Sequence, residues 1–313
     1  MIGTGRPGGW ASGTATHAGA YRACTHTVLV GVCDSDPARA ADGARRWGVA
    51  AYSDPRRLLA EARPEIVSIC TPDETHGPIL RLLLRDPMVR AILAEKPLAL
   101  TVPEAASAVR LARVAGVKLA VNYSRRYSPE HAELQRLIAA GRLGPIQKIQ
   151  GLYTKGVLHN GTHWFDLARW LVGDFSSVRG IGPTRLSDPE IDVLIDFRNG
   201  AKGCLQCCAA SAFGVFEMDV IGTHGRARIT ESGHKIEFQR PRPSPRYRGF
   251  RALAPWKTVR PPLKSTLRLA VADLARSLRR GCQPACTGED GLAALRAATA
   301  AIRSARQRRA PRP

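Results

Sequence analysis

The sequence contains no apolar run long enough to cross a membrane. A spanning helix needs roughly 20 consecutive apolar residues, and charged or polar residues interrupt every run in this chain before that length. The opening residues, MIGTGRPGGW, also lack the apolar core of a secretory signal peptide. These two absences predict a cytoplasmic protein that has no membrane partner.

Acidic side chains are scarce. The chain has 26 Asp and Glu against 47 Lys and Arg, a formal net charge of +21 at pH 7. The imbalance is greatest in residues 240–313, where 18 Lys and Arg face only three acids. Such a stretch could attract nucleic acid or anionic metabolites. No RNA-binding aromatic motif or zinc finger accompanies the charge, so we interpret it as solvated arginine and expect no nucleic-acid partner.

The eight cysteines do not form a convincing metal site. Cys204, Cys207 and Cys208 cluster in GCLQCC, and a Cys-x-x-Cys pair occurs in zinc sites. Residues 201–209 have the pattern of a strand, however, so Cys204 and Cys207 would point to opposite faces. We expect reduced, structural thiols and no metal.

Strand and helix patterns alternate in the first part of the 313-residue chain, which predicts a parallel sheet with helices on both faces. The expected strands are Thr27–Cys33, Glu65–Thr71, Ala91–Glu95 and Lys118–Asn122. The expected helices lie near 37–47, 74–85 and 102–115. A chain of this length suggests two domains, and we place the first at residues 1–122.

The rhythm changes after Asn122, and successive strands there predict a second domain, residues 123–313, with a mostly antiparallel sheet. We expect helices near 128–140 and 161–172, a Pro- and Arg-rich loop at 240–262, and closing helices near 264–280 and 288–307. The expected strands lie near 146–154, 176–181, 190–197, 201–209, 214–222, 226–230 and 234–239.

A glycine loop opens the chain. Gly3-Thr4-Gly5-Arg6-Pro7-Gly8 matches G-x-G-x-x-G, in which glycines let the backbone approach a pyrophosphate at a helix N-terminus. A helical run, a strand and Asp34 follow, and a carboxylate at that place binds the adenosine ribose hydroxyls. The alternative for Asp34 is a turn or cap residue in Asp-Ser-Asp-Pro. The pattern favours a Rossmann domain that binds NAD, with NADP possible.

Only Met1 and Ile2 precede this loop. The first strand of such a domain is central in its sheet and needs about five residues. We therefore expect the true start to lie upstream, or the gene to be damaged, and a chain beginning at Met1 to be poorly stable or to bind cofactor weakly.

Two further segments carry candidate chemistry. Lys96, in Glu95-Lys96-Pro97, follows a predicted strand, and ligands bind beyond the carboxyl ends of strands in open α/β sheets; the alternative is an ordinary surface lysine. His163 lies on the edge of a predicted helix, beside an apolar stripe at helical spacing. The alternative there is a core histidine bonded to a neighbour such as Asp166. The stripe comprises Trp164, Leu167, Ala168 and Leu171.

The chain resembles the glucose–fructose oxidoreductase/inositol dehydrogenase/MocA family. The segments that carry the resemblance occur in family order across most of the chain: IGTGRP, VGVCDSDPARA, VSICTPDETH, AILAEKPLALT, VNYSRRYSP, GRLGPIQKIQG and GTHWFDLARWLVG. The resemblance implies a Rossmann domain joined to an α/β domain with a large open sheet. It also implies that Lys96 and His163 flank the substrate carbon. The cofactor residues that it implies, together with the loop and Asp34, are Gly3, Gly5, Arg6, Asp34, Thr71, Pro72, His76, Glu95, Lys96 and Asn122.

The sequence departs from the family pattern at His159. Many polyol-oxidising members carry an Asp four residues before the histidine, whereas this chain has His159 followed by Asn160. We expect His159 and Asn160 to bind substrate, with Arg126 and Tyr127 as further contacts. His159 and His163 have a spacing that binds metal on helices, but no glutamate accompanies them, and we expect no metal.

The predicted reaction is hydride transfer at a secondary alcohol carbon of a sugar or sugar derivative. His163 would act as the general base and Lys96 would stabilise the developing alkoxide. We also expect a homo-oligomer. The sequence leaves two other functions open: a non-catalytic NAD(P)-binding regulator, and a glycoside hydrolase that uses NAD transiently.

Overall fold

The computed structural model describes residues 15–307. Gly3, Gly5 and Arg6 of the glycine loop lie outside this range. Packing divides the chain into two units: residues 1–127 with 264–293, and residues 128–263 with 294–313. The domain boundary after Asn122 stays a prediction, and the packing differs from it mainly by grouping residues 264–293 with the first unit.

Several helices of the first unit begin at a side chain that caps them. Asp36 accepts hydrogen bonds from the N–H groups of Ala38 and Arg39, and Pro37 stands in the first turn, where its missing N–H costs nothing. Thr101 caps a later helix in the same way. The α-helices of this unit are α1 His17–Ala23, α2 Pro37–Trp47, α3 Pro55–Ala62, α4 His76–Leu83, α5 Val102–Ala115 and α8 Thr266–Arg280.

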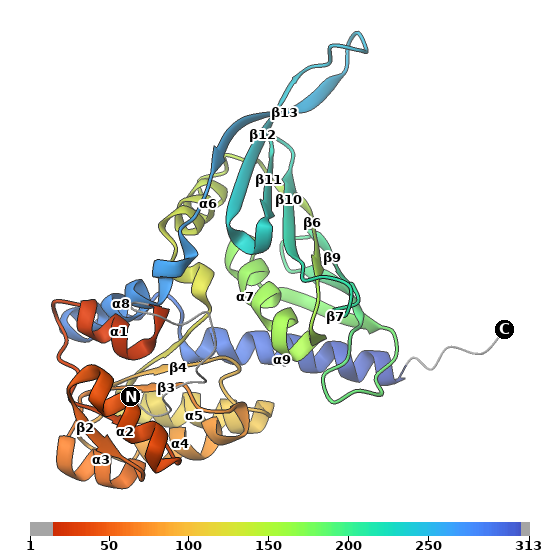
Figure 1. Cartoon of the computed structure of the whole chain (residues 1–313). Coiled ribbons are helices and arrows are strands. Elements are labelled where there is room, and N and C mark those ends of the chain that lie inside the picture. Colours follow the sequence, from red (N-terminus) through yellow and green to blue (C-terminus); the bar gives the residue numbers. More distant parts are fainter. Residues whose placement is uncertain (1–14, 308–313) are drawn as a thin grey trace. The chain divides into compact units, whose positions relative to one another are not determined.

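The strands of the first unit are short and parallel. They form two pieces, β1–β2 and β3–β4–β5. The middle strand β4 is buried along its whole length, as expected for a parallel strand covered on both faces. Figure 1 shows α1 and α8 on one side of β3 and β4, and α4 and α5 on the other. The strands are β1 Gly31–Cys33, β2 Ala50–Tyr52, β3 Ile66–Ile69, β4 Ala91–Ala94 and β5 Lys118–Val121.

A cavity of about 510 Å³ lies between the two pieces, lined mainly by residues 25–31 before and within β1 and by residues 62–66 leading into β3. Within residues 15–307, no strand joins β1 to β3. Val28 on this rim is 85% exposed. The first strand that the sequence predicts to be nearly absent would lie outside the described residues, and the cavity marks the place that a central strand occupies in such a fold.

The second unit contains one continuous sheet in the order β13-β12-β11-β10-β6-β9-β8-β7. Only β6 and β9 pair in parallel, and the other six neighbouring pairs are antiparallel. The strands are β6 Ile146–Tyr153, β7 Phe175–Ile181, β8 Asp192–Phe197, β9 Lys202–Cys207, β10 Phe216–Gly222, β11 Arg226–Thr230, β12 Lys235–Pro243 and β13 Arg251–Val259. The predicted α/β fold class, a Rossmann-type parallel sheet followed by a mostly antiparallel open sheet, is confirmed.

Helix α7, Gly161–Val172, packs on this sheet. The apolar stripe predicted around Trp164 is buried, and the Trp164 indole N–H donates to the Glu217 carbonyl in β10 at 3.2 Å. Helix α6, Pro129–Ala139, packs against α7. Helix α9, Gly288–Gln307, begins in the first unit and ends in the second.

The expectation of a loop over 240–262 is wrong. β12 continues to Pro243, and β13 runs alongside it from Arg251. The last contact of β11 with β12 is at Gln239, so residues 240–254 form a two-stranded ribbon that stands beyond the sheet (Figure 1). Proline is tolerated where its nitrogen faces away from the ladder, which explains why a Pro-rich segment can still form strands.

The eight cysteines are all free. Cys204 and Cys207 both lie in β9, three residues apart, so their side chains leave opposite faces of the sheet. No helix within residues 15–307 is long and apolar enough to cross a membrane.

Candidate active site

Polar side chains of the first unit gather at the carboxyl ends of its parallel strands. Asp34 follows β1, Thr71 follows β3, and Asn122 follows β5. Glu95 and Lys96 follow β4, and both are half-buried. Parallel strands end at the same edge of a sheet, which is where open α/β sheets bind ligands.

A cavity of about 890 Å³ opens at the ends of β1 and β3. The Asp34 carboxylate, 8% exposed, lies on its wall. It accepts a hydrogen bond from the Asp36 N–H at 3.0 Å and lies 3.5 Å from the Arg39 guanidinium. Other lining residues are Cys33, Ser35, Cys70, Thr71 and Pro72. This wall offers both a carboxylate and a cation to a ligand.

Glu95 is the centre of a three-residue cluster. One of its carboxylate oxygens lies 2.9 Å from His17 Nε2 and accepts a hydrogen bond from Asn122 Nδ2 at 2.7 Å. Burial alone would raise the pKa of Glu95, but the hydrogen bonds from His17 and Asn122 and the charge of Lys96 outweigh it and hold this pKa below its usual range. Glu95 is therefore a carboxylate at neutral pH.

His17 was missed in the sequence analysis. It begins α1, just after the glycine loop, and is buried. A histidine at the start of the helix that follows a predicted phosphate-binding loop could have indicated a site residue, because that position faces the strand ends. Among the described residues, neither His17 Nδ1 nor Asn122 Oδ1 has a hydrogen-bond partner.

His76 is buried and connects two loops of the site. Its Nδ1 lies 2.7 Å from the Pro97 carbonyl, and its Nε2 lies 3.0 Å from the Thr71 carbonyl. Both ring nitrogens therefore contact backbone oxygens beside proposed cofactor residues. A direct contact of His76 with cofactor stays a prediction.

In the second unit, the predicted substrate residues follow one another along the chain. His159 and Asn160 lie in a π-helical turn, Gly156–Asn160, that leads directly into α7. His159 is exposed, whereas Asn160 and His163 are half-buried. The Thr162 hydroxyl, beside His163, donates to the Leu158 carbonyl at 2.9 Å. The turn and the helix thus carry all three side chains on one continuous piece of backbone.

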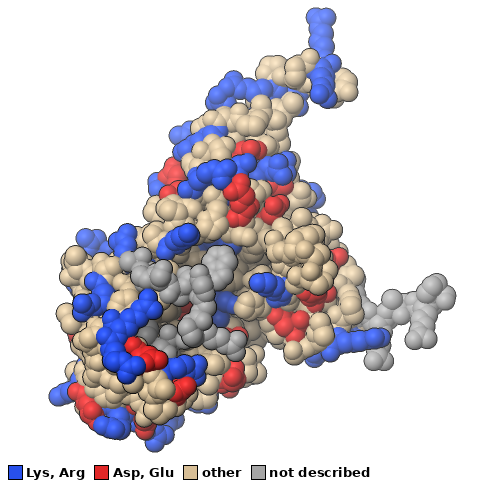
Figure 2. Space-filling model, in the orientation of Figure 1, with Lys and Arg blue, Asp and Glu red and all other residues tan. Residues whose placement is uncertain are grey.

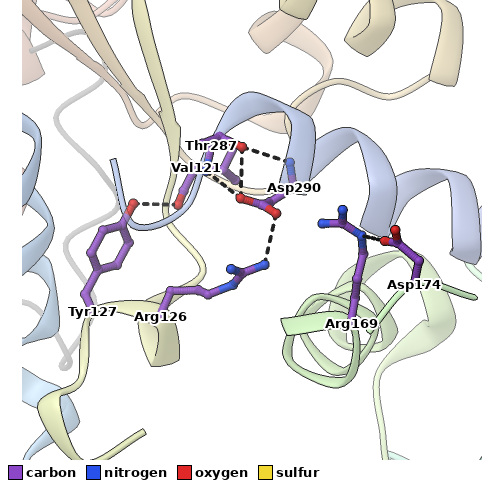
Figure 3. Close-up of polar contacts among 7 residues, drawn as sticks. All are labelled: Val121, Arg126, Tyr127, Arg169, Asp174, Thr287 and Asp290. Carbon is purple, nitrogen blue, oxygen red and sulfur yellow. Dashed lines mark hydrogen bonds and ion pairs between the residues drawn. The ribbon is translucent and has the colours of Figure 1, made fainter. Parts of the chain in front are cut away.

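Arg126 and Tyr127 lie in the interior of the first unit (Figure 3). The Arg126 guanidinium lies 3.2 Å from the Asp290 carboxylate, which also accepts from the N–H and the hydroxyl of Thr287. The Tyr127 hydroxyl donates to the Val121 carbonyl at 3.0 Å. These bonds hold the end of β5 against the start of α9. A role of either side chain in substrate binding stays a prediction.

Two profiles of one protein family match the chain in succession. Residues 1–123 match the oxidoreductase family of the glucose–fructose oxidoreductase/inositol dehydrogenase/MocA type, NAD-binding Rossmann fold. Residues 147–312 match the C-terminal alpha/beta domain of the same family. The chain belongs to this oxidoreductase family. The predicted NAD(P)-dependent oxidoreductase, with NAD as its cofactor, is confirmed at the level of the family.

Relatives and solved structures agree with this assignment. The scyllo-inositol 2-dehydrogenase (NAD(+)) of Bacillus subtilis (strain 168) is 30% identical over 65% of this chain and 67% of its own length. The inositol 2-dehydrogenase of Rhizobium meliloti (strain 1021) is 26% identical over 99% of this chain and 97% of its own. A levoglucosan dehydrogenase, solved with NADH and levoglucosan, has a TM-score of 0.83 at 22% identity, covering 98% of this chain and 96% of that one. That last likeness shows a shared fold.

The residues of this oxidoreductase fit a dinucleotide. The carboxylate of Asp34 suits a ribose diol, and the polar atoms of His17 and Asn122 that lack partners within residues 15–307 could bond to a ligand's polar groups. Cys33 and Cys70 line the same cavity, and no sequence motif predicted them there. Burial raises the pKa of Cys33 to about 11 and that of Cys70 to about 12, so both stay neutral thiols. The described residues contain no group of three side chains arranged to hold a metal ion.

Proposed function

We propose that this oxidoreductase moves a hydride between nicotinamide and a secondary alcohol carbon of a sugar or sugar derivative. The observation that carries the proposal is the set of polar residues at the strand ends, with Lys96 next to the ordered Glu95 cluster. The substrates named for the relatives, inositols and levoglucosan, support a polyhydroxylated ring as the substrate class.

Each proposed residue has one task. The nicotinamide, when bound, supplies the hydride acceptor or donor. In the oxidation direction an imidazole nitrogen of His163 accepts the proton of the substrate hydroxyl. The Lys96 ammonium donates a hydrogen bond to the same oxygen and stabilises the negative charge that develops there. His159 and Asn160 orient a neighbouring hydroxyl.

On the cofactor side, we assign the adenosine ribose to Asp34 and the nicotinamide side to Thr71, Pro72, Glu95 and Asn122. The His17 and Asn122 bonds fix the Glu95 carboxylate in one orientation. A fixed carboxylate loses less entropy on binding a ribose hydroxyl than a mobile one does. The glycine-loop positions Gly3, Gly5 and Arg6 keep their proposed role at the pyrophosphate.

We further propose that the protein works in the cytoplasm as a homo-oligomer. Eight free cysteines suit a reducing compartment. Ile181 and Leu194 lie on the same face of the sheet, as the pairing of β7 with β8 requires, and are 46% and 38% exposed. Light scattering coupled to size-exclusion chromatography would test the oligomer, and a monomer at micromolar concentration would contradict it.

The function is tested by incubating the protein and NAD with a panel of polyols and sugars and following NADH absorbance. Net NADH formation with at least one of scyllo-inositol, myo-inositol and levoglucosan is the expected result. Sugar release from a glycoside without net NADH would favour the hydrolase alternative. Tight NAD binding with no turnover on any panel member would favour the regulator.

A further inference from the structure

A carboxylate from a distant loop holds the segment that carries His159. Asp188 lies between β7 and β8, and its two oxygens accept hydrogen bonds from the N–H groups of Leu158 at 2.7 Å and His159 at 2.9 Å. The carbonyl of Pro189 accepts from the Val157 N–H at 3.0 Å. One loop therefore satisfies three successive donors at the start of the helical segment.

These donors need a partner, because the first N–H groups of a helix have none within it. The partner is commonly the side chain just before the helix. Here that position is Lys155, which has a left-handed backbone and makes no capping bond. Asp188 supplies the cap from another element, and its negative charge suits a helix N-terminus.

The fit around Asp188 is close. A Cβ added to Gly156 would come within 2.2 Å of the Asp188 carboxyl carbon, so the carboxylate needs a glycine there. The other end of the loop is fixed by Tyr153, whose hydroxyl donates to the Ile191 carbonyl at 2.7 Å. Burial raises the pKa of Tyr153 well above its usual range, which keeps this donor protonated.

We infer that Asp188 is a positioning residue for His159, Asn160 and His163, and this inference rests on the function proposed for those three side chains. The connection runs from the carboxylate to the backbone of Leu158 and His159. It continues from the Leu158 carbonyl to the Thr162 hydroxyl, next to His163. Many polyol-oxidising members of the family carry an Asp at the position of His159. In this chain His159 stands there, and the carboxylate that contacts its backbone comes from Asp188.

Three variants separate this role from a general loss of structure. Asp188→Ala removes both acceptors. Asp188→Asn keeps the shape and one acceptor but turns an amide toward the second N–H. Gly156→Ala displaces the carboxylate without changing it. The matched control is Asp174→Asn at the other end of α7, where an exposed carboxylate lies 2.7 Å from Arg169 Nε (Figure 3).

The first measurement is NMR of protein carrying ¹³Cε1-histidine, with the two signals assigned from His159→Asn and His163→Asn. Asp188→Ala and Gly156→Ala should shift or broaden both signals, whereas Asp174→Asn should leave them in place. The second measurement is kcat/KM for scyllo-inositol, myo-inositol and levoglucosan at saturating NAD. We expect a loss of about 10- to 100-fold in Asp188→Ala, because small misplacements of substrate-positioning groups cost this much, and a smaller loss in Asp188→Asn.

NAD affinity, measured by fluorescence titration, should stay within about twofold in all four variants. Unchanged histidine signals in Asp188→Ala, or unchanged kcat/KM for a probe that the wild type oxidises, would overturn the inference. So would a loss of kcat/KM in Asp188→Ala matched by equal losses of NAD binding and melting temperature. If the wild type oxidises none of the probes, the proposed function fails, and the NMR result still decides whether Asp188 positions the histidines.

Discussion

The two sheets of this oxidoreductase differ in how completely their strands are paired. Within residues 15–307, the first unit has five strands of three or four residues in two separate pieces. The second unit has eight strands of five to nine residues in one sheet. The cofactor region therefore has fewer hydrogen bonds between strands. Its folded state gains more stability from any segment that fills the gap between β1 and β3, or from any ligand that binds at the strand ends. The second unit depends mainly on its own packing.

The largest expected effect is the loss of kcat when the proposed catalytic group of either region is removed. Lys96→Ala in the first unit and His163→Ala in the second should each lower kcat about 10²- to 10⁴-fold, the usual contribution of general acid–base groups. Stopped-flow NADH formation with the best panel substrate measures kcat, and fluorescence titration measures NAD affinity. Both variants should still bind NAD. Near-wild-type turnover in either one would remove that residue from the site.

The next effect concerns the cavity between β1 and β3. A chain extended at its N-terminus by an apolar segment of roughly four to six residues, the length of a short strand, should melt at a higher temperature. Each buried backbone group that gains a hydrogen-bond partner stabilises the fold by roughly 1–3 kcal/mol. Several such groups should therefore add a large share of a typical free energy of unfolding, which is about 5–15 kcal/mol.

Hydrogen exchange locates the gain that this extension produces. Protection should rise in β1 and β3 and stay constant in β6 and β9, which already have two neighbours each. A scrambled polar extension of equal length is the control. Equal melting temperatures for the apolar and the polar extension would show that the cavity does not accept a strand.

Two half-buried carboxylates, Glu95 of the first unit and Asp196 of the second, compare the two regions by pH. Glu95→Gln should lower the free energy of unfolding at pH 7 by about 1.5–3 kcal/mol, the range for hydrogen bonds to charged groups. Because the pKa of Glu95 is lowered in the folded protein, its stabilisation is present above the ordinary glutamate pKa of about 4.3. It is lost as the pH falls through the lower folded value. Melting curves from pH 7 to pH 3 should therefore show the wild type and the variant converging.

Asp196 of β8 is the matched control for this measurement. Hydrogen bonds from Lys202 and Ser177 lower its pKa, but its cationic partners Lys202 and Arg179 are exposed, and solvent screens such pairs. Asp196→Asn should therefore change the melting temperature less than Glu95→Gln does at every pH. A Glu95→Gln difference that does not change with pH would show that the charge of the carboxylate is not responsible.

The smallest effect concerns the choice of cofactor in the first unit. Asp34 should repel a 2′-phosphate and bind a free ribose diol, so NAD should bind more tightly than NADP. Asp34→Ala should shift the ratio of the two dissociation constants toward NADP by about tenfold, or 1.4 kcal/mol. Arg39, 3.5 Å from Asp34, is exposed enough to meet a phosphate, and Arg39→Gln should shift the ratio the other way. Tighter binding of NADP than NAD by the wild type would refute the role of Asp34.

The sequence predicted most elements because local signals and packing agree. The apolar run at 91–94, the proline-started helix at 102–115 and the stripe around Trp164 all appear as expected. The short strand β2, Ala50–Tyr52, escaped notice because three residues carry no periodicity. The ribbon at 240–254 was missed because prolines and arginines are typical of loops, and only pairing between its two strands makes it regular.

The sequence placed Lys96 and Asn122 just after strand ends, where the structure also has them, and their roles stay predictions. The predicted site was incomplete where the partner is distant in the chain. His17 and Glu95 are 78 residues apart, and Asp188 is 29 residues from His159. No local pattern connects such pairs, since only the folding of each unit brings them together. The ion pair between the buried Arg126 and Asp290, which are far apart in the sequence, could not be predicted for the same reason.

The ribbon beyond Gln239 also decides where the chain can be cut. Within residues 15–307 its two strands pair only with each other there, and the turn between them contains exposed Arg246 and Arg248. Figure 2 shows Lys and Arg at the tip of the ribbon. Exposed turns of this kind are the preferred sites of proteolytic nicking and of tolerated insertions. Brief trypsin treatment should therefore cleave the turn first, and the fragments should stay together through the remaining ladder of β12 with its neighbours. The same turn is where a purification tag or a fluorescent label can be placed at little expense to the sheet.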